Sequence, residues 1–239
     1  MCGLVGYIGS RTAPLMVFEG LVKLEYRGYD SAGIATLQQG EIVVHRDEGK
    51  LSKLASLLIA HPVNGHVAMG YIRRNSDGSP GRRNGHPDCD QSGSVAVILS
   101  GTVENYLELR QQLQKEGHTF RSDTDTEVIV HLVESQLAVG CDLVEAGRRA
   151  FQKIKGRQAI VLMSKHEPER LVAAQLGHAS GVIIGLARGE TFIASHIRAI
   201  LDYTQRMIFL EDGEIAIVAR DGASFVDLAS APMKRALTI

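Results

Sequence analysis

Hydrophobic residues recur along the chain with two periods, one typical of strands and one typical of helices. The continuous apolar run at residues 3–8 predicts a buried strand, and the helical spacing of apolar side chains after Pro14 predicts a helix directly behind it. Residues 34–49 alternate on either side of Gly40 and therefore predict a hairpin. The same patterns then predict a helix over residues 50–61 and strands over residues 66–74 and 94–101.

A long polar segment separates the last two of these strands. Residues 74–92 are rich in glycine, proline, asparagine and arginine, so they are expected to stay out of the core. Connections of this length without secondary structure are usually functional or disordered. The segment is therefore expected to be a loop of one of these two kinds.

Helical periodicity returns after the second of the two strands. It covers residues 104–116 and residues 143–154. A further helix between them is expected to begin after the sequence SDTDTE, where Thr124 and Glu127 have the spacing of a capping box. Three helices thus form the middle of the chain.

From residue 158 the pattern is strand-like to the end of the sequence. Asp212-Gly213 and Asp221-Gly222 are hairpin signals within this part. Antiparallel strands at both ends of the chain, with helices between them, predict an α+β fold. The expected architecture is a four-layer αββα sandwich, in which two mainly antiparallel sheets share one core and carry helices on both outer faces. No internal repeat or linker interrupts the pattern, so residues 2–239 are expected to form one domain.

Composition and charge exclude several classes of function. Of 239 residues, 44% are hydrophobic and 22% are charged, and the net charge is −1, which is ordinary for a globular protein and gives no reason to expect nucleic acid as a partner. No apolar stretch approaches the roughly 20 residues that span a membrane, and no basic segment precedes the first apolar run. A cytoplasmic protein that does not associate with membranes is expected. Phosphate-binding glycine motifs are absent from the sequence, so no nucleotide cofactor is expected.

Cys2 is one of three cysteines, and their odd number and wide spacing argue against a disulfide framework. Cys2 is interpreted as a small buried hydrophobic residue, as an accident of the translation start, or as a nucleophile. The third interpretation requires removal of Met1, which a small second residue permits. The free α-amine of Cys2 would then titrate near 7.7–8.0 and could accept the thiol proton, so that base and nucleophile belong to one residue.

Four stretches of the sequence together resemble a known family. They are CGLVGYIG at residues 2–9, LEYRGYDSAG at 24–33, NGHP at 84–87 and SDTDTEVIVHLV at 122–133. These motifs are similar to those of class II glutamine amidotransferase domains, which have the N-terminal nucleophile hydrolase fold. Within that class the chain most resembles the glutaminase half of the glucosamine 6-phosphate synthases, and the resemblance extends from Cys2 to about Val226.

The resemblance implies a role for each residue that matches a family motif. Cys2 would attack the side-chain amide of glutamine, and the resulting thioester would be hydrolysed to glutamate after ammonia leaves. The other implied roles are an α-carboxylate contact for Arg73, an α-ammonium contact for Asp125, an oxyanion-binding N–H for Gly101, a substrate-side loop position for His86 and for Ser76, and packing around the nucleophile for Arg27. No cofactor is implied.

The sequence departs from the family at several of these positions. Ser100 stands where the family has the asparagine that completes the oxyanion hole, and loss of one such donor costs on the order of 10² to 10³ in rate. Arg74 replaces a tryptophan and Asp77 a histidine, while Tyr71 and Leu99 each stand for a histidine. Ser76 replaces a threonine. These changes concentrate at the expected site.

Three functions therefore remain open. The chain is interpreted as a glutaminase, as a glutamine-binding pseudoenzyme that lacks a complete oxyanion hole, or as a related hydrolase adapted to another amide. The expected partners are L-glutamine and a sugar-phosphate isomerase, or another domain or subunit that accepts ammonia. The isomerase domains of the synthases have no counterpart in this sequence, so the chain alone is not expected to make glucosamine 6-phosphate.

A metal site is the remaining candidate in the polar segment. His86, Asp88, Cys89 and Asp90 lie close together in the stretch NGHPDCDQ. Their spacing matches no common zinc pattern, and the family resemblance accounts for His86. No metal site is therefore expected.

Overall fold

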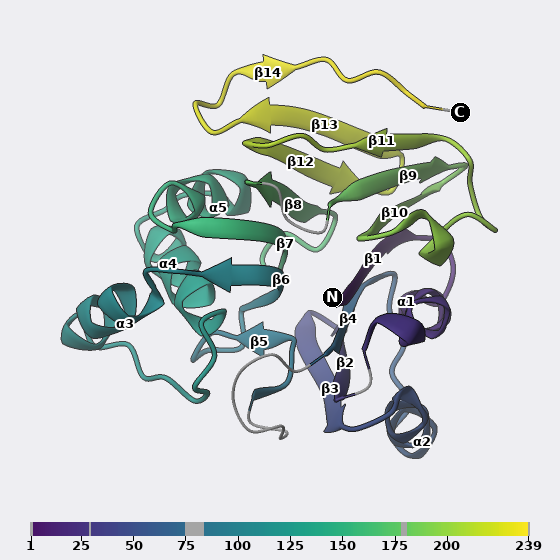
Figure 1. Cartoon of the computed structure of the whole chain (residues 1–239), viewed down its shortest axis with the longest axis horizontal. Coiled ribbons are helices and arrows are strands. Elements are labelled where there is room, and N and C mark those ends of the chain that lie inside the picture. The colour runs from purple at the N-terminus through teal and green to yellow at the C-terminus, as the bar shows by residue number, and fades with distance from the viewer. Residues whose placement is uncertain (1, 29, 75–83, 178–180, 239) are drawn as a thin grey trace.

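Two antiparallel sheets lie face to face in the computed structural model, which describes residues 2–28, 30–74, 84–177 and 181–238 (Figure 1). Within these ranges each sheet has seven strands. The first sheet has the order β11-β9-β10-β1-β4-β2-β3, with β1 at Gly3–Gly9, β2 at Ser31–Gln38, β3 at Glu41–Glu48, β4 at Val67–Arg73, β9 at Ile183–Ala187, β10 at Glu190–Ala194 and β11 at Met207–Phe209.

The second sheet contains the strands of the middle and the end of the chain. Its order is β14-β13-β12-β8-β7-β6-β5, with β5 at Asp88–Cys89, β6 at Val95–Val103, β7 at Gly156–Ser164, β8 at Leu171–Leu176, β12 at Glu214–Ala219, β13 at Gly222–Asp227 and β14 at Pro232–Met233. Neighbouring strands are antiparallel in both sheets.

Helices cover the outer faces of both sheets (Figure 1). Two of them, α1 at Ala13–Lys23 and α2 at Leu51–Ala60, pack on the first sheet. The other three are α3 at Tyr106–Lys115, α4 at Glu127–Ala138 and α5 at Leu143–Phe151; α4 and α5 contact the second sheet, and α3 packs on α4. Short 3₁₀ helices occupy Glu25–Arg27 and Ile197–Ala199. The predicted four-layer αββα arrangement is confirmed. No described helix is long and apolar enough to cross a bilayer.

The first strand shows why its sequence is continuously apolar rather than alternating. Leu4 and Ile8 point into the core between the two sheets, whereas Val5 and Tyr7 point to the other side and pack beneath α1. A strand that is buried on both faces gains from apolar side chains at every position. The strand therefore lies at the centre of its sheet, between β10 and β4.

The hairpin predicted at Asp212-Gly213 is wrong. The strand before it, β11, pairs with β9 in the first sheet, whereas β12 pairs with β8 and β13 in the second. The dipeptide therefore lies where the chain crosses between sheets, and Asp212 accepts a hydrogen bond of 2.5 Å from the N–H of Gly177. The second signal is confirmed, because Asp221-Gly222 closes the tight hairpin between β12 and β13.

The capping box predicted for Thr124 and Glu127 is also wrong. The residue that precedes α4 is Thr126, and the Thr124 hydroxyl instead donates to Asp88 over 3.0 Å. The Glu127 carboxylate accepts the backbone N–H groups of Arg121 and Ser122, at 2.6 and 2.7 Å. Glu127 therefore fastens the loop before the helix.

The expectation that residues 74–92 stay out of the core fails for part of the segment. Residues 75–83 lie outside the described ranges, but β5 pairs with β6, and His86, Asp88 and Asp90 are buried. Both carboxylates have partners, since Asp90 accepts the N–H of Val95 over 2.7 Å and Asp88 accepts the Thr124 hydroxyl over 3.0 Å. Polar residues at these positions form a buried network rather than a solvated loop.

Gly33 allows β2 to lie against the segment that carries His86. A Cβ atom at position 33 would lie 2.2 Å from the His86 carbonyl oxygen and 2.8 Å from Arg46 Cβ. We expect Gly33→Ala to lower the free energy of unfolding by about 1–3 kcal/mol, the usual cost of overpacking, when measured by urea denaturation.

Gly40→Ala is the control for this substitution. Gly40 has φ of 81°, so alanine there is strained, but its Cβ would meet no atom within 4 Å. A loss for Gly33→Ala no larger than the loss for Gly40→Ala would contradict the close approach.

Candidate active site

A cavity of about 380 Å³ lies where the end of β4, the start of β1, the end of β6 and the loop before α4 meet. Five of the site residues predicted from the sequence line it, namely Cys2, Arg73, His86, Gly101 and Asp125. These residues are separated by up to 123 positions, so only the fold brings them together. Ser76 lies outside the described residues.

The position of Cys2 follows from the pairing of β1 with β4. Gly3 lies opposite Ile72 and Leu4 opposite Tyr71, so the residue before β1 reaches the end of β4. The Cys2 thiol is half-buried and lies 3.9 Å from the carbonyl oxygen of Arg74. All three cysteines have free thiols.

Tyr71 is the neighbour of Cys2 whose importance the sequence did not reveal. Its ring is buried and meets the His86 ring edge-on, with the centroids 4.8 Å apart. Tyr71 and Cys2 line the same cavity, where the Tyr71 hydroxyl lies close enough to the Cys2 thiol for the thiol to affect its titration. Burial, reinforced by Cys2, raises the pKa of Tyr71 well above its ordinary value, so the phenol keeps its proton at neutral pH.

Arg73 and Asp125 place opposite charges on the wall of the cavity. Arg73 donates to the carbonyl oxygen of Asn84 over 2.7 Å, and Asp125 accepts the N–H of Val103 over 2.6 Å. Burial raises the pKa of Asp125, and the Val103 N–H and the charges of His86 and Arg73 offset part of that rise. A cationic group bound beside Asp125 would favour its ionised form.

Gly101 has a conformation that requires glycine. Its φ is 145°, and a Cβ atom would lie only 1.9 Å from the carbonyl oxygen of Arg157 on the neighbouring strand. Ser100, directly before it, is 4% exposed and is not among the described residues that line the cavity. The backbone at Gly101 therefore faces the cavity while the Ser100 side chain is buried.

His86 has neighbours on both sides of its ring. Nδ1 lies 3.1 Å from a carboxylate oxygen of Asp88, and Nε2 lies 3.4 Å from the hydroxyl of Thr126. Arg46 donates to the carbonyl oxygens of Gly85 and Pro87, at 2.8 and 2.9 Å, and so holds the backbone on either side of His86. The backbone at His86 is thus held by Arg46, whereas Nδ1 of the ring lies near Asp88 without a hydrogen bond among the described residues.

Arg27 is buried but does not line the cavity in the described structure. Its guanidinium lies 3.4 Å from the Ser195 carbonyl oxygen, and the Ser195 hydroxyl accepts the N–H of Leu4 over 3.0 Å. This contact ties the end of the 3₁₀ helix to β1, close to Cys2. The predicted packing role is consistent with this position.

Eight further described residues line the cavity, and four of them are singled out in the sequence for other reasons: Tyr71, Arg74 and Leu99 as departures from the family and Thr124 as a capping candidate. The remaining lining residues are Tyr71, Arg74, Leu99, Thr102, Tyr106, Asp123, Thr124 and Thr126. Those from the loop before α4 could have been found only by extending the role of Asp125 to its neighbours. Arg74, which stands for a tryptophan of the family, adds a second guanidinium beside Arg73.

The chain is similar to known proteins in sequence. A family model described as a glutamine amidotransferase domain matches residues 81–202, slightly more than half of the chain. The glutamine–fructose-6-phosphate aminotransferase (isomerizing) of Pyrococcus horikoshii is 43% identical over 234 residues, which are 98% of this chain and 39% of that protein. The enzyme of the same name from Aquifex aeolicus is 41% identical over 239 residues, covering 100% of this chain and 40% of its own. The chain thus spans about two-fifths of these relatives.

Solved structures resemble the fold over almost the whole chain. A glutamine phosphoribosylpyrophosphate amidotransferase from B. subtilis, complexed with ADP and GMP, superposes with a TM-score of 0.81 at 25% identity, covering 97% of this chain and 50% of that one. A glutamine aminotransferase class-II domain protein from Silicibacter pomeroyi superposes with a TM-score of 0.64 at 19% identity, covering 97% of this chain and all of that one, and supports the fold alone.

These findings agree with the motifs and with the arrangement of the cavity. The family model, the sequence relatives and the shared fold all point to the same kind of domain. The chain belongs to the class II glutamine amidotransferase domain family.

Proposed function

We propose that this domain hydrolyses the side-chain amide of L-glutamine to glutamate and ammonia through a thioester at Cys2. The observation that carries the proposal is the convergence of the Cys2 thiol, the Arg73 guanidinium and the Asp125 carboxylate around one cavity. Family membership supports the same reaction. Each of these groups has a complementary group on glutamine.

Substrate recognition follows from the charges of the cavity wall. The planar Arg73 guanidinium binds both oxygens of the α-carboxylate, and Asp125 accepts the α-ammonium group. Because the two contacts require a free α-carboxylate and a free α-ammonium group, they would make the site selective for free glutamine over a glutamine residue within a polypeptide. The side-chain amide then points toward Cys2.

The reaction requires that Met1 be removed. The α-amine of Cys2 accepts the thiol proton, and the sulfur attacks the amide carbon while the carbonyl electron pair moves to oxygen. The backbone N–H of Gly101 stabilises that oxyanion. When the intermediate collapses, the C–N bond breaks and the α-ammonium returns the proton to the leaving nitrogen. Water, deprotonated by the same amine, then hydrolyses the thioester and regenerates the thiol.

Tyr71 acts as a positioning residue in this scheme. Its hydroxyl keeps its proton and can therefore donate to the sulfur of Cys2 throughout the physiological pH range. A donated hydrogen bond stabilises the anionic form of the nucleophile and orients it. The edge-on contact of the Tyr71 ring with His86 holds the phenol in place.

A second candidate function is glutamine binding without turnover. Ser100 stands where the family has an oxyanion-binding asparagine, and its buried side chain is not among the described residues that line the cavity. The family's oxyanion hole has two donors, and here the Gly101 N–H is the one that remains. Loss of the other lowers kcat by a factor on the order of 10² to 10³. The third interpretation, another amide substrate, rests on Arg74 and Asp77 alone.

The ammonia would pass to an acceptor outside this domain. The relatives, about two-fifths of whose length the chain spans, are named for glutamine, fructose 6-phosphate and isomerisation. We propose that residues 2–239 form a glutaminase domain and that the acceptor is a sugar-phosphate isomerase domain or subunit.

Covalent labelling tests the nucleophile. We expect the purified protein to have lost Met1 and to gain one adduct from an electrophilic glutamine analogue, measured by intact mass. Cys2→Ala should gain none, and Cys89→Ala should react like the parent because Cys89 does not line the described cavity. A processed protein that takes no adduct, or an adduct that persists in Cys2→Ala, would contradict the proposal.

Restoring the missing amide tests the oxyanion hole. We expect Ser100→Asn to raise kcat for glutamine hydrolysis by about tenfold or more, because one oxyanion donor is worth on the order of 10² to 10³. Ser100→Ala should match the parent enzyme if the serine hydroxyl does not reach the oxyanion. An unchanged kcat in Ser100→Asn, with glutamine still bound, would show that the serine is not the limiting feature.

Removal of one hydroxyl tests the role of Tyr71. We expect Tyr71→Phe to slow alkylation of Cys2 by iodoacetamide roughly fivefold at neutral pH, the equivalent of one hydrogen bond of about 1 kcal/mol. Tyr106→Phe, which changes another tyrosine of the same cavity, is the control and should leave the rate unchanged. Equal rates in Tyr71→Phe and the parent would exclude the positioning role.

A further inference from the structure

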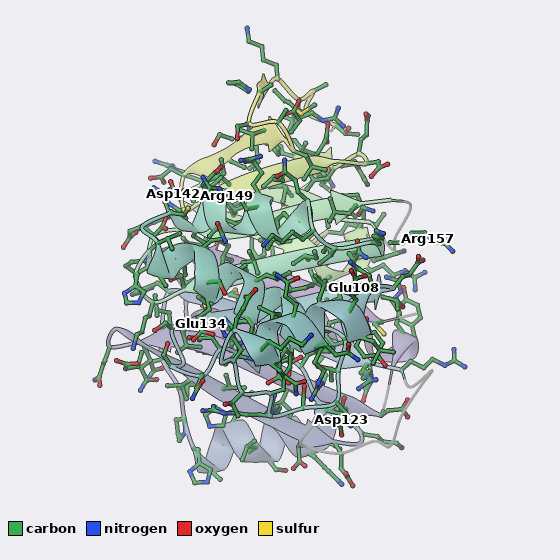
Figure 2. All side chains as sticks on the ribbon, turned by 90° about the vertical axis from the view of Figure 1, so that its left-hand side faces the viewer. Glu108, Asp123, Glu134, Asp142, Arg149 and Arg157 are labelled. Atoms are coloured by element: carbon green, nitrogen blue, oxygen red, sulfur yellow. The ribbon has the colours of Figure 1, made fainter. Side chains whose placement is uncertain are left out.

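Two histidines and one glutamate converge on the helical face of the second sheet, apart from the cavity that contains Cys2. His131 and Glu134 belong to α4, and His118 lies in the segment between α3 and α4. Figure 2 shows Glu134 on this face. The same oxygen of Glu134, Oε2, lies 3.0 Å from His118 Nδ1 and 2.9 Å from His131 Nδ1. The three atoms all lie within 4.8 Å of one another.

The hydrogen bonds of Ser135 determine which nitrogen of a neutral His118 carries the proton. The Ser135 hydroxyl donates its hydrogen to the carbonyl oxygen of His131 over 2.9 Å. It can therefore only accept at its 2.9 Å contact with His118 Nε2, which must be the protonated nitrogen. In neutral His118, the lone pair of Nδ1 then faces the carboxylate of Glu134. This contact is repulsive unless a proton or a metal ion lies between the two atoms.

His131 has a related conflict. Its ring is 1% exposed, and both of its nitrogens face carboxylates, Nδ1 facing Glu134 and Nε2 lying 3.7 Å from Glu127 Oε1. A neutral imidazole carries one proton, so it cannot donate to both. The 3.7 Å contact is too long for a hydrogen bond, so the buried Nε2 has no hydrogen-bond partner among the described residues. The cluster thus directs two imidazole nitrogens at one carboxylate oxygen, an arrangement that suits a bound cation.

We propose that His118, His131 and Glu134 bind a divalent transition metal, with Zn²⁺ as the best match. Two imidazole nitrogens and one carboxylate oxygen are a common three-ligand set for zinc, with water in the fourth position. Two ligands at about 2.0 Å in tetrahedral geometry lie about 3.3 Å apart, so the 2.9 and 3.0 Å separations between Glu134 and the two histidines need to widen by a few tenths of an ångström. The two imidazole nitrogens, which lie within 4.8 Å of each other, would have to reach the same spacing by rotation of the partly buried His118.

The surroundings supply what a zinc site needs beyond its ligands. With the metal on both Nδ1 atoms, each Nε2 keeps a proton, and His118 donates it to Ser135 while His131 directs it toward Glu127. Such outer contacts orient metal-bound histidines. The charges of Glu127 and Glu134 together would balance those of the ion.

Zinc titration against a fluorescent chelator tests the proposal at about pH 8, where histidine is ordinarily neutral. All variants carry Cys2→Ala so that this thiol cannot contribute. We expect the parent to bind one Zn²⁺, and Ser135→Ala, which removes only an outer contact, to bind about 10- to 100-fold more weakly. His118→Ala and Glu134→Gln should bind more weakly still. Co²⁺ in place of zinc should give tetrahedral visible absorption without a thiolate band.

The pair His45 and His61 provides a matched control. Their rings lie 6.3 Å apart, and the described residues do not join them to a third donor group. The double variant His45→Ala, His61→Ala should bind zinc as the parent does. His118 is only partly buried, so His118→Ala is expected to fold, which circular dichroism checks. Zinc affinity that is undetectable in the parent, or equal in the parent and His118→Ala, would show that the cluster only shares protons.

Discussion

The antiparallel pairing of β1 with β4 is the constraint on which the candidate site depends. It places the residue before β1 beside the end of β4, so that Cys2 meets Tyr71 and the backbone of Arg74. A slip of one residue would turn the side chains of β1 to the opposite faces of the sheet. Because β1 is buried on both sides, such a slip would disturb the core between the sheets and the packing beneath α1 together. Core packing therefore also positions Cys2.

A buried polar network contributes two of its members, His86 and Thr124, to the wall of the cavity. His86 contacts Asp88, Asp88 accepts from Thr124, and the Thr124 and Ser122 hydroxyls are 2.8 Å apart. Ser122 donates in turn to Glu127 at the start of α4. A buried donor or acceptor that loses its hydrogen-bond partner costs about 1–3 kcal/mol of folding free energy. Movement of one member of the network would therefore be opposed by the loss of its neighbour's hydrogen bond. The network joins the segment that carries His86 to the loop that carries Asp125, and both residues are thereby presented to the same cavity.

Glu127 belongs to this network and also stands behind the histidine cluster of α4. Burial would raise its pKa, but the His131 ring 3.7 Å away and hydrogen bonds from the N–H groups of Arg121 and Ser122 and from the Ser122 hydroxyl lower it to about 2. The residue is therefore an anion at neutral pH, in contact with the loop on one side and with His131 on the other. A change of charge at His131 or Glu134 would therefore alter the surroundings of Glu127, whose carboxylate holds the loop that carries Asp125.

The amino-acid pattern alone predicted much of this protein. Periodicity located the buried first strand, the hairpin around Gly40 and the three central helices, because these depend on which face of an element is buried. The motifs identified the family and five of the thirteen described residues that line the cavity. The hydrophobic pattern does not specify which distant strands pair with each other. Asp212-Gly213 has the local chemistry of a hairpin, but β11 and β12 pair with different sheets.

Tertiary structure also decided what the polar residues do. His86, Asp88 and Asp90 were expected in a loop because they are polar, whereas they are buried. Distant segments supply Thr124 and Arg46 to Asp88 and Thr126 to His86, while Asp90 accepts from the nearby N–H of Val95. In the sequence, Tyr71 was noted only because the family has a histidine at this position. Its proximity to Cys2 arises because β1 and β4 pair. Local sequence determines the periodicity and conformational preference of each element. The partners of a buried polar group come from elsewhere in the chain, so only the folded structure identifies them.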